Sequence, residues 1–175
     1  GFGFTLIEDA TLPPLGFEND ELEALVLGLR EVEQIGDPDL AKAARSALNK
    51  LQARLPPRQS HRLAHAVLTA QRFSRPEVPK ISVSELRQAT WDELAIEFAY
   101  SDAVGAQTHR RVNPLGMSYL DRSTVLLAWC HLRQDLRPFR LDRMSALRIT
   151  DPSFRPTRVP RLRQALAVLE NTPAP

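Results

Sequence analysis

Cysteine is nearly absent from this sequence, because Cys130 is the single one among 175 residues. One cysteine cannot form an internal disulfide and cannot build a cysteine-based zinc site. No apolar run approaches the roughly 20 residues that a membrane-spanning helix needs. Residues 1–6 also lack the basic segment and long apolar core of a secretory signal peptide. We therefore expect a cytoplasmic protein that makes no contact with a membrane.

Lysine is absent from the second half of the chain. Residues 1–80 hold 10 basic and 11 acidic groups, whereas residues 81–175 hold 13 basic groups, all of them arginine, and 10 acidic groups. Between His131 and Arg163 there are nine arginines and three aspartates. The planar guanidinium fork suits phosphate and carboxylate better than an ammonium group does. This stretch therefore indicates anion recognition, although a GC-rich genome explains the arginine bias equally well.

The composition is otherwise that of a globular protein, with 43% hydrophobic and 25% charged residues. The first helix of three is predicted from an apolar stripe formed by Leu22, Leu25, Val26, Leu29 and Val32. Asn19 or Asp20 is expected to cap its start, and Gly36 suits a left-handed exit. Asp37 and Pro38 then supply an N-cap and a first-turn proline for the second helix.

Two further helices are expected before the chain changes character. The second has an apolar stripe from Leu40 to Leu51, and the third starts near Pro57 and extends toward Phe73. Short loops predict that neighbouring helices run antiparallel. Such a small helical unit has little core of its own, so we expect it to pack on another surface. Residues 74–80, which include two prolines, are expected to form a linker.

Beyond this linker, apolar residues alternate as in strands. Ser82 or Ser84 is expected to cap a short helix that ends near residue 90. Strands are predicted at 94–100, 107–115 (closed by Pro114), 117–120, 125–129 and around 139–141 and 147–149, with a turn at 101–106 and a last helix at 160–170. Short strands at this spacing predict a small, strongly bent sheet or barrel, and the chain as a whole is assigned to the α+β class.

Several segments of the second part match a known domain in order and spacing. They are residues 96–102 with Gly105, residues 111–116, Tyr119, residues 126–133 and, most specifically, Arg137–Arg143. The stretch from Leu86 to Phe154 thereby resembles the WYL domain, a small Sm-like (SH3-like) β-barrel of bacterial transcriptional regulators. Upstream, residues 18–55 resemble the helical connector of YafY-like regulators of the DeoR type. Residues 1–6 resemble the end of their winged helix-turn-helix.

The resemblance implies an organisation in four parts. These are a wing remnant at 1–6, a helical connector and dimerisation region at 15–73, a WYL domain at 82–155 and a C-terminal helix and tail at 156–175. It also implies a homodimer that binds DNA through an N-terminal domain that this chain lacks. One departure concerns the triplet that names the family, because Thr124-Val125-Leu126 stands in place of Trp-Tyr-Leu. Threonine and valine suit the strand, but the contacts of two aromatic rings are missing.

In the WYL family, arginines of the segment 137–143 line a basic pocket. Arg137, Arg140 and Arg143 are therefore the first candidates for ligand binding. Trp129 lies in the most apolar strand and is expected in the core. Aromatic and hydrogen-bonding contacts with the ligand are expected from Tyr100, Tyr119 and His131.

Strand geometry restricts how these arginines can act together. Successive residues point to opposite faces, so Arg137 and Arg140 share a face only if the chain bends or bulges near Pro138. The alternative is a solvated strand edge, on which Asp135 and Asp142 pair with the arginines locally.

Other chemistry has weaker support in the sequence. His61 and His65 have a metal-ligand spacing on a helix, but no third ligand is near, so surface or interface histidines are expected instead of a metal site. Ser123, His131 and Asp135 hold the atom types of a hydrolytic triad, yet no Gly-x-Ser-x-Gly elbow surrounds Ser123. No glycine-rich phosphate loop follows a strand. We expect neither catalytic activity nor a cofactor.

The sequence thus predicts the ligand-sensing and dimer-forming region of a regulator. An anionic effector, either single-stranded DNA or a nucleotide, would bind the arginines of the WYL domain. The connectors of two chains would then pass a change in dimer geometry to the winged helices. The rival interpretation is a constitutive dimerisation or protein-interaction module whose ligand site has been lost. Convergent arginines around an open cavity favour sensing, and an apolar, filled interior favours scaffolding.

Overall fold

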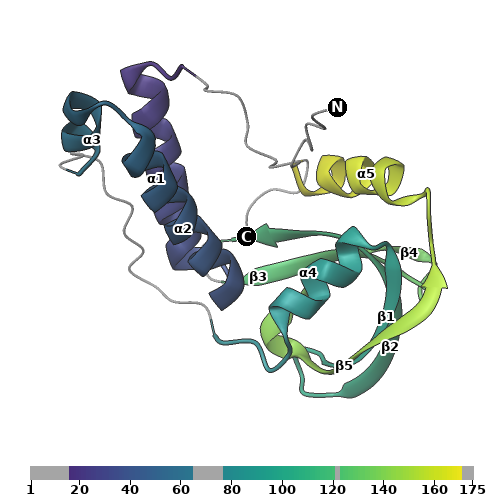
Figure 1. Cartoon of the computed structure of the whole chain (residues 1–175). Coiled ribbons are helices and arrows are strands. Elements are labelled where there is room, and N and C mark those ends of the chain that lie inside the picture. Colours follow the sequence, from purple (N-terminus) through teal and green to yellow (C-terminus); the bar gives the residue numbers. More distant parts are fainter. Residues whose placement is uncertain (1–15, 65–76, 121–122, 171–175) are drawn as a thin grey trace, which may run out of the picture.

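A computed structural model describes residues 16–64, 77–120 and 123–170 of the chain (Figure 1). Three helices form an N-terminal unit, and a five-stranded antiparallel sheet with two helices forms the sheet domain. The predicted α+β class is confirmed. None of the helices in these ranges is long and apolar enough to cross a bilayer.

Helices α1 (Asn19–Ile35) and α2 (Pro38–Arg54) form a hairpin joined by two residues. The predicted caps of α1 were wrong: Glu18 occupies the N-cap position, and its backbone N–H donates to the Glu21 carboxylate at 2.7 Å. Gly36 is extended, with φ −69°, and does not adopt the predicted left-handed conformation. A Cβ at Gly36 would lie 2.7 Å from the carbonyl oxygen of Val32, so close approach explains the glycine.

The N-cap predicted for α2 is confirmed. The Asp37 carboxylate accepts hydrogen bonds from the backbone N–H groups of Asp39 and Leu40, at 3.1 and 3.2 Å. Inside the hairpin, Leu22 and Val26 are buried, and they pack against Phe17, Leu48, Leu51 and Leu55. The hairpin core is therefore small.

Helix α3 (Pro57–Ala64) follows α2 directly. The predicted extension of this helix to Phe73 lies outside the described residues, as do His65 and residues 74–76 of the linker expected at 74–80, whereas residues 77–80 form neither helix nor strand. The wing remnant expected at residues 1–6 lies outside them as well.

The sheet has the strand order β4-β3-β2-β1-β5, with every neighbouring pair antiparallel. Its strands are β1 (Leu94–Ser101), β2 (Gln107–Tyr119), β3 (Thr124–Cys130), β4 (Asp135–Arg140) and β5 (Met144–Ser153). Pro114 was predicted to end the second strand, but β2 continues to Tyr119 and includes the separate strand expected at 117–120. A register shift between Pro114 and Gly116 accommodates the missing proline N–H.

Both faces of the sheet carry a helix (Figure 1). Helix α4 (Val83–Trp91), capped by Ser82 as predicted, contributes Leu86 and Ala89 to the core on the concave face. That core also contains Ile96, Phe98, Val112, Leu126, Ala128, Cys130, Phe139, Leu141 and Met144. Helix α5 (Arg158–Glu170) packs on the convex face, where Ala165 contacts the cluster of Val125 and Leu127. Strand β3 is thus buried on both faces, as predicted.

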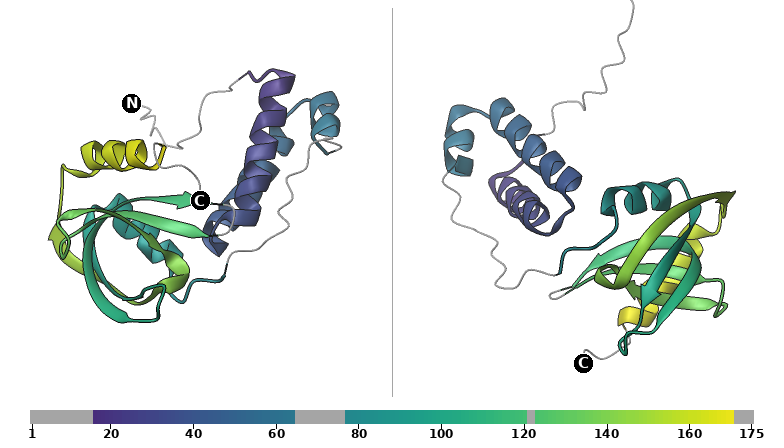
Figure 2. Two further views of the ribbon diagram at one scale, coloured as in Figure 1. Left: turned by 180° about the vertical axis from the view of Figure 1, so that it is seen from behind. Right: turned by 90° about the horizontal axis from the view of Figure 1, so that it is seen from below.

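The sheet curves strongly around α4 (Figure 2), but its pairing leaves β4 and β5 as two edges. The closed Sm-like barrel is therefore not confirmed. A single 3₁₀ turn, η1 (Leu141–Arg143), connects the two edge strands. The Tyr100 hydroxyl of β1 accepts a hydrogen bond from the backbone N–H of Arg140 at 3.4 Å. A tyrosine hydroxyl of β1 therefore reaches the backbone of the edge strand β4.

One ion pair connects the hairpin to the sheet domain. The Arg87 guanidinium of α4 donates through Nε and Nη2 to both carboxylate oxygens of Asp37, at 3.2 and 3.3 Å. The Asp37 side chain is only 1% exposed. Because the same carboxylate caps α2, one buried side chain fixes the start of that helix against α4.

Candidate anion-binding site

Arg140 and Asp142 meet where β4 runs into η1. The Arg140 guanidinium donates through Nε and Nη2 to the two carboxylate oxygens of Asp142, at 3.1 and 2.6 Å. This bond holds the pKa of Asp142 below its ordinary value and raises the pKa of Arg140. The Arg140 side chain stays 41% exposed, against 10% for Asp142. Asp142 therefore orients the guanidinium while part of it remains open to solvent.

Arg137 lies on the opposite face of β4 from Arg140. It pairs with Ala128, a residue of the concave core, whereas Arg140 pairs with Val125 of the convex face. The restriction predicted from strand geometry therefore holds. The Arg137 guanidinium lies 3.7 Å from the Asp135 carboxylate. Both local pairs of the alternative interpretation are thus present.

Arg143 closes η1 and differs from these two arginines. Its side chain is half-buried and has no hydrogen bond or ion pair among the described residues. Arg143 acts on Asp142 electrostatically, and the Asp142 carboxylate already binds Arg140. The corner between β4 and η1 thus holds two guanidinium groups, those of Arg140 and Arg143, and Glu77 acts on Arg140 electrostatically in addition to Asp142.

Arg110 on β2 is a candidate that the sequence analysis missed. It pairs with Phe98 of the concave core, and its Nε and Nη1 atoms are buried without a hydrogen-bond partner among the described residues. A buried donor without a partner is costly, and a functional role is one explanation for such a group. The alternation along β2 could have identified it, since Arg110 shares a strand face with the apolar Val112.

Tyr100 is the predicted aromatic residue that the structure brings to the arginines. Its ring contacts that of Phe139 edge to face, with 5.2 Å between centroids, and Phe98 completes the aromatic group. Its hydroxyl reaches the backbone of Arg140. Tyr100 is therefore both part of the core and part of the candidate site.

Tyr119 and His131 lie elsewhere. The Tyr119 hydroxyl is buried without a partner in the described part of the chain, and burial followed by the nearby Asp37 raises its pKa. It therefore lies beside the ion pair between the two units. His131 lies beyond the far end of β3, where its Nε2 is 2.8 Å from the Asn113 side-chain oxygen. The six predicted ligand residues thus do not form one constellation.

The triplet Thr124-Val125-Leu126 occupies the start of β3. Thr124 pairs with Tyr119, Leu126 belongs to the concave core and Val125 packs under α5. Trp129, predicted in the core, is instead half-buried on the convex face beneath the Arg161 guanidinium. That prediction was wrong because α5 supplies a cation, not an apolar side chain, at this position.

Neither a hydrolytic triad nor a metal site is assembled among the described residues. Ser123 and His131 flank the two ends of β3, and Asp135 pairs with Cys130 across the β3–β4 hairpin. Seven strand residues span roughly 23 Å, so serine and histidine cannot meet. Among the described ranges no group of three histidine, cysteine, aspartate or glutamate residues could hold a metal ion.

Comparison with known proteins gives two findings. The solved structure of proteasome accessory factor B/C (PafBC) of Arthrobacter aurescens is similar at 21% identity and a TM-score of 0.43, over 83% of this chain. The chain spans only 22% of the length of that protein. Residues 82–149, from the N-cap of α4 into β5, match the family model of the WYL domain. This part of the chain is therefore similar to WYL domains.

Proposed function

We propose that the chain is the ligand-sensing and dimer-forming region of a transcriptional regulator. Its WYL domain binds an anionic effector, a nucleic acid or a nucleotide, at the arginines of the β4–η1 corner. The helical hairpin transmits binding to a winged helix-turn-helix N-terminal to it. The observation that carries the proposal is the Arg140 guanidinium, which Asp142 orients and which stays 41% exposed at this corner of the segment similar to WYL domains.

Charge and geometry support an anion as the ligand. Arg140 is held in place by Asp142, so one side of its fork is fixed before a ligand arrives. Arg143 follows within the same turn without a carboxylate of its own among the described residues. A phosphate placed here would accept charge-assisted hydrogen bonds from preoriented donors.

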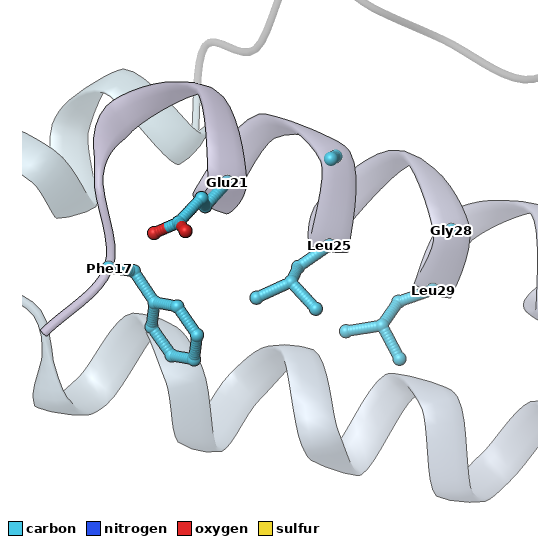
Figure 3. A pocket seen from close by; sticks show the side chains of 6 residues that line it. Phe17, Glu21, Leu25, Gly28 and Leu29 are labelled. Atoms are coloured by element: carbon cyan, nitrogen blue, oxygen red, sulfur yellow. The ribbon is translucent and has the colours of Figure 1, made fainter. Parts of the chain in front are cut away.

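The surface of α1 supports the dimer. An open groove of about 540 Å³ is lined by Phe17, Glu21, Ala24, Leu25, Gly28 and Leu29. Figure 3 shows the Phe17, Leu25 and Leu29 side chains on the same side of α1. Leu25 is 40% exposed. A second hairpin would bury this apolar stripe, which the small core of one hairpin leaves open.

The observation that favours the rival function is the interior of the sheet. Phe98, Tyr100 and Phe139 fill it with rings in edge-to-face contact, and Asp135 and Asp142 already neutralise two of the arginines. A constitutive interaction module would need nothing more. The two functions differ in one property, namely whether anions bind at the β4–η1 corner.

A salt-controlled titration with oligonucleotides and nucleotides tests the effector site. We expect Arg140→Ala to weaken binding about tenfold or more, since hydrogen bonds to charged groups contribute roughly 1.5–3 kcal/mol. Arg137→Ala should have a smaller effect, and wild-type affinity should fall as salt rises. Arg45→Ala removes an exposed arginine of α2 and serves as the charge-matched control. Unchanged affinity in both Arg137→Ala and Arg140→Ala would refute the effector site.

Sedimentation tests the dimer separately. The wild-type chain should dimerise at roughly tens of micromolar, as expected for a modest interface. Leu25→Glu should give a monomer, because it places a charge in the apolar stripe. Glu23→Gln changes the charge of α1 outside the lining of the groove and should leave the dimer intact. A wild-type monomer at these concentrations would contradict the paired connector while leaving the effector site untouched.

A further inference from the structure

The convex face of the sheet carries a second group of cationic and aromatic side chains. It consists of Arg111 and Asn113 on β2, Trp129 and His131 at the end of β3, and Arg161 on α5, and we call it the convex-face patch. Asn113 pairs with Trp129, and the His131 backbone N–H donates to the Arg111 carbonyl oxygen at 3.1 Å. The patch lies at the end of β3 opposite to Val125, the strand partner of Arg140. It is therefore separate from the β4–η1 corner.

Among the described residues, the guanidinium groups of this patch form no ion pair with a carboxylate. The Arg161 guanidinium carbon lies 4.2 Å from the centroid of the Trp129 ring, so the cation is held by the indole. Neither Arg161 nor Arg111 forms an ion pair within the described part of the chain. Glu97 stands opposite Arg111 across the strands, but its carboxylate accepts from Arg148 at 2.5 Å. Arg111 acts on Glu97 only electrostatically, so both guanidinium groups keep donors for an anion.

His131 is oriented to complete such a site. An amide oxygen only accepts, so the contact with Asn113 makes His131 Nε2 the donor and leaves Nδ1 as the second ring position. Asn113 is itself buried, which fixes the ring. Burial, then Arg111 and Arg161, lower the pKa of His131. Both guanidinium groups of the patch therefore act on the His131 ring.

A second arginine–indole pair extends the patch along α5. The Arg158 guanidinium carbon lies 5.2 Å from the centroid of the Trp91 ring, which is 64% exposed. Arg158 and Arg161 are three residues apart and so lie on neighbouring turns of one helix face. Indoles that alternate with arginines match a single nucleic-acid strand, whose bases stack and whose phosphates bind guanidinium groups.

We propose that the convex-face patch is a second anion-binding site, which takes a phosphate group between Arg111, Arg161 and His131. The phosphate can be free or part of a nucleic-acid strand, and the pair of Arg158 and Trp91 favours the strand. This site does not depend on Arg137, Arg140 or Arg143. A WYL domain with both sites can contact two segments of one strand from opposite ends of β3.

The chain offers its own probe for this proposal. Trp91 and Trp129 are its two tryptophans, so intrinsic fluorescence reports on the patch and its extension. The 175-residue chain is titrated with inorganic phosphate and, separately, with a short oligothymidylate, while the His131 ring is followed by NMR. A shift of His131 with both ligands identifies a general phosphate site. A shift with the oligothymidylate alone, together with tryptophan quenching, identifies a strand site.

Matched variants decide the assignment. Arg111→Gln and Arg161→Gln should each weaken oligothymidylate binding about tenfold and reduce the salt dependence by about one phosphate contact. Arg163→Gln removes the same charge from the same helix but from another side, and should change affinity less than about twofold. Arg161→Lys keeps the charge without the stacking fork and covers the case in which Arg161→Gln folds poorly.

A pH series adds an independent readout. An anion favours the charged imidazole, so the pKa of His131 should rise on binding. The affinity for a phosphodiester, which keeps a constant charge here, should correspondingly increase as pH falls through that pKa. Wild-type affinity in both Arg111→Gln and Arg161→Gln, or no response of His131 to either ligand, would overturn the proposal. Either result leaves the test with Arg137 and Arg140 unaffected, so the two sites are judged separately.

Discussion

The helical hairpin and the sheet domain are stabilised in different ways. The concave core of the sheet domain contains eleven buried residues, and α5 adds a second small core on the convex face. The hairpin core contains two buried residues, and the hairpin is also fixed by the Asp37–Arg87 ion pair. A unit with few buried contacts costs less to reorient than one with a dense core. This difference is consistent with the proposed function, in which the densely packed sheet domain binds the ligand and the hairpin transmits binding.

Phe98→Ala tests the rigid half of this comparison and should have the largest effect. Phe98 is 1% exposed and contacts both Tyr100 and Phe139. We expect the free energy of unfolding to fall by about 3–5 kcal/mol, as for other buried aromatic truncations. Urea unfolding followed by circular dichroism measures the loss. Val104→Ala, in the exposed turn between β1 and β2, is the control. A loss below about 1 kcal/mol would contradict a single tightly packed core.

Asp37→Ala tests the junction and should rank second. It removes the α2 cap and leaves Arg87 without its partner, so we expect a loss of about 2–3 kcal/mol. Asp37→Asn keeps a capping oxygen but removes the charge. Its loss of stability should therefore be about 1 kcal/mol smaller than that of Asp37→Ala. Asp39→Ala changes a neighbouring exposed carboxylate of the same helix turn. If thermal unfolding gave equal melting temperatures for Asp37→Ala and Asp39→Ala, the junction would not stabilise the hairpin.

Arg110→Met separates stability from binding within the sheet domain. Removal of a buried guanidinium without partners should raise the free energy of unfolding by about 1 kcal/mol, while oligonucleotide binding falls. Arg133→Met, in the exposed β3–β4 turn, should change neither quantity much. Urea unfolding and the binding titration are made on the same preparations. Loss of stability without loss of binding would show that Arg110 has a structural role only.

The smallest expected effect is the pH dependence of the stability that the Arg140–Asp142 pair contributes. Arg140 lowers the pKa of Asp142. The pair therefore stabilises the folded state at pH values above the ordinary pKa of an aspartate. That stabilisation is lost as pH falls through the lowered pKa. Carboxyl carbon NMR of Asp142 should show the late protonation, and Arg140→Gln should return the titration to its ordinary range. An unshifted wild-type titration would mean that Asp142 does not orient Arg140.

Local signals in the sequence were sufficient for much of the framework. Asp37 before Pro38 predicted the α2 cap, and Ser82 predicted the start of α4. The alternation of Ile96 and Phe98 predicted β1 and its buried face. These features depend on residues close together in the chain, where backbone preference and periodicity are informative.

The features that the sequence did not reveal depend on distant residues. Pro114 would end a strand in isolation, but a bulge opposite β3 allows β2 to continue. Trp129 would be core in an apolar strand, but Arg161 reaches it from α5. Tyr119 and Arg140 were both predicted to bind the ligand, yet the fold separates them because Tyr119 lies beside the Asp37–Arg87 pair. Residue types identified candidate ligand groups, whereas only the strand register separates the β4–η1 corner from the convex-face patch.

The hydrogen bond from Arg140 to Tyr100 has a consequence for aggregation. Outward-pointing N–H groups of an edge strand come from alternate residues, which in β4 are Leu136, Pro138 and Arg140. Leu136 donates to the Asp135 carboxylate at 2.8 Å, Pro138 has no N–H, and Arg140 donates to Tyr100. Every outward donor of β4 is therefore either occupied or missing. A foreign strand finds no donor on this edge, so β4 is protected against the edge-to-edge growth that exposed strands invite.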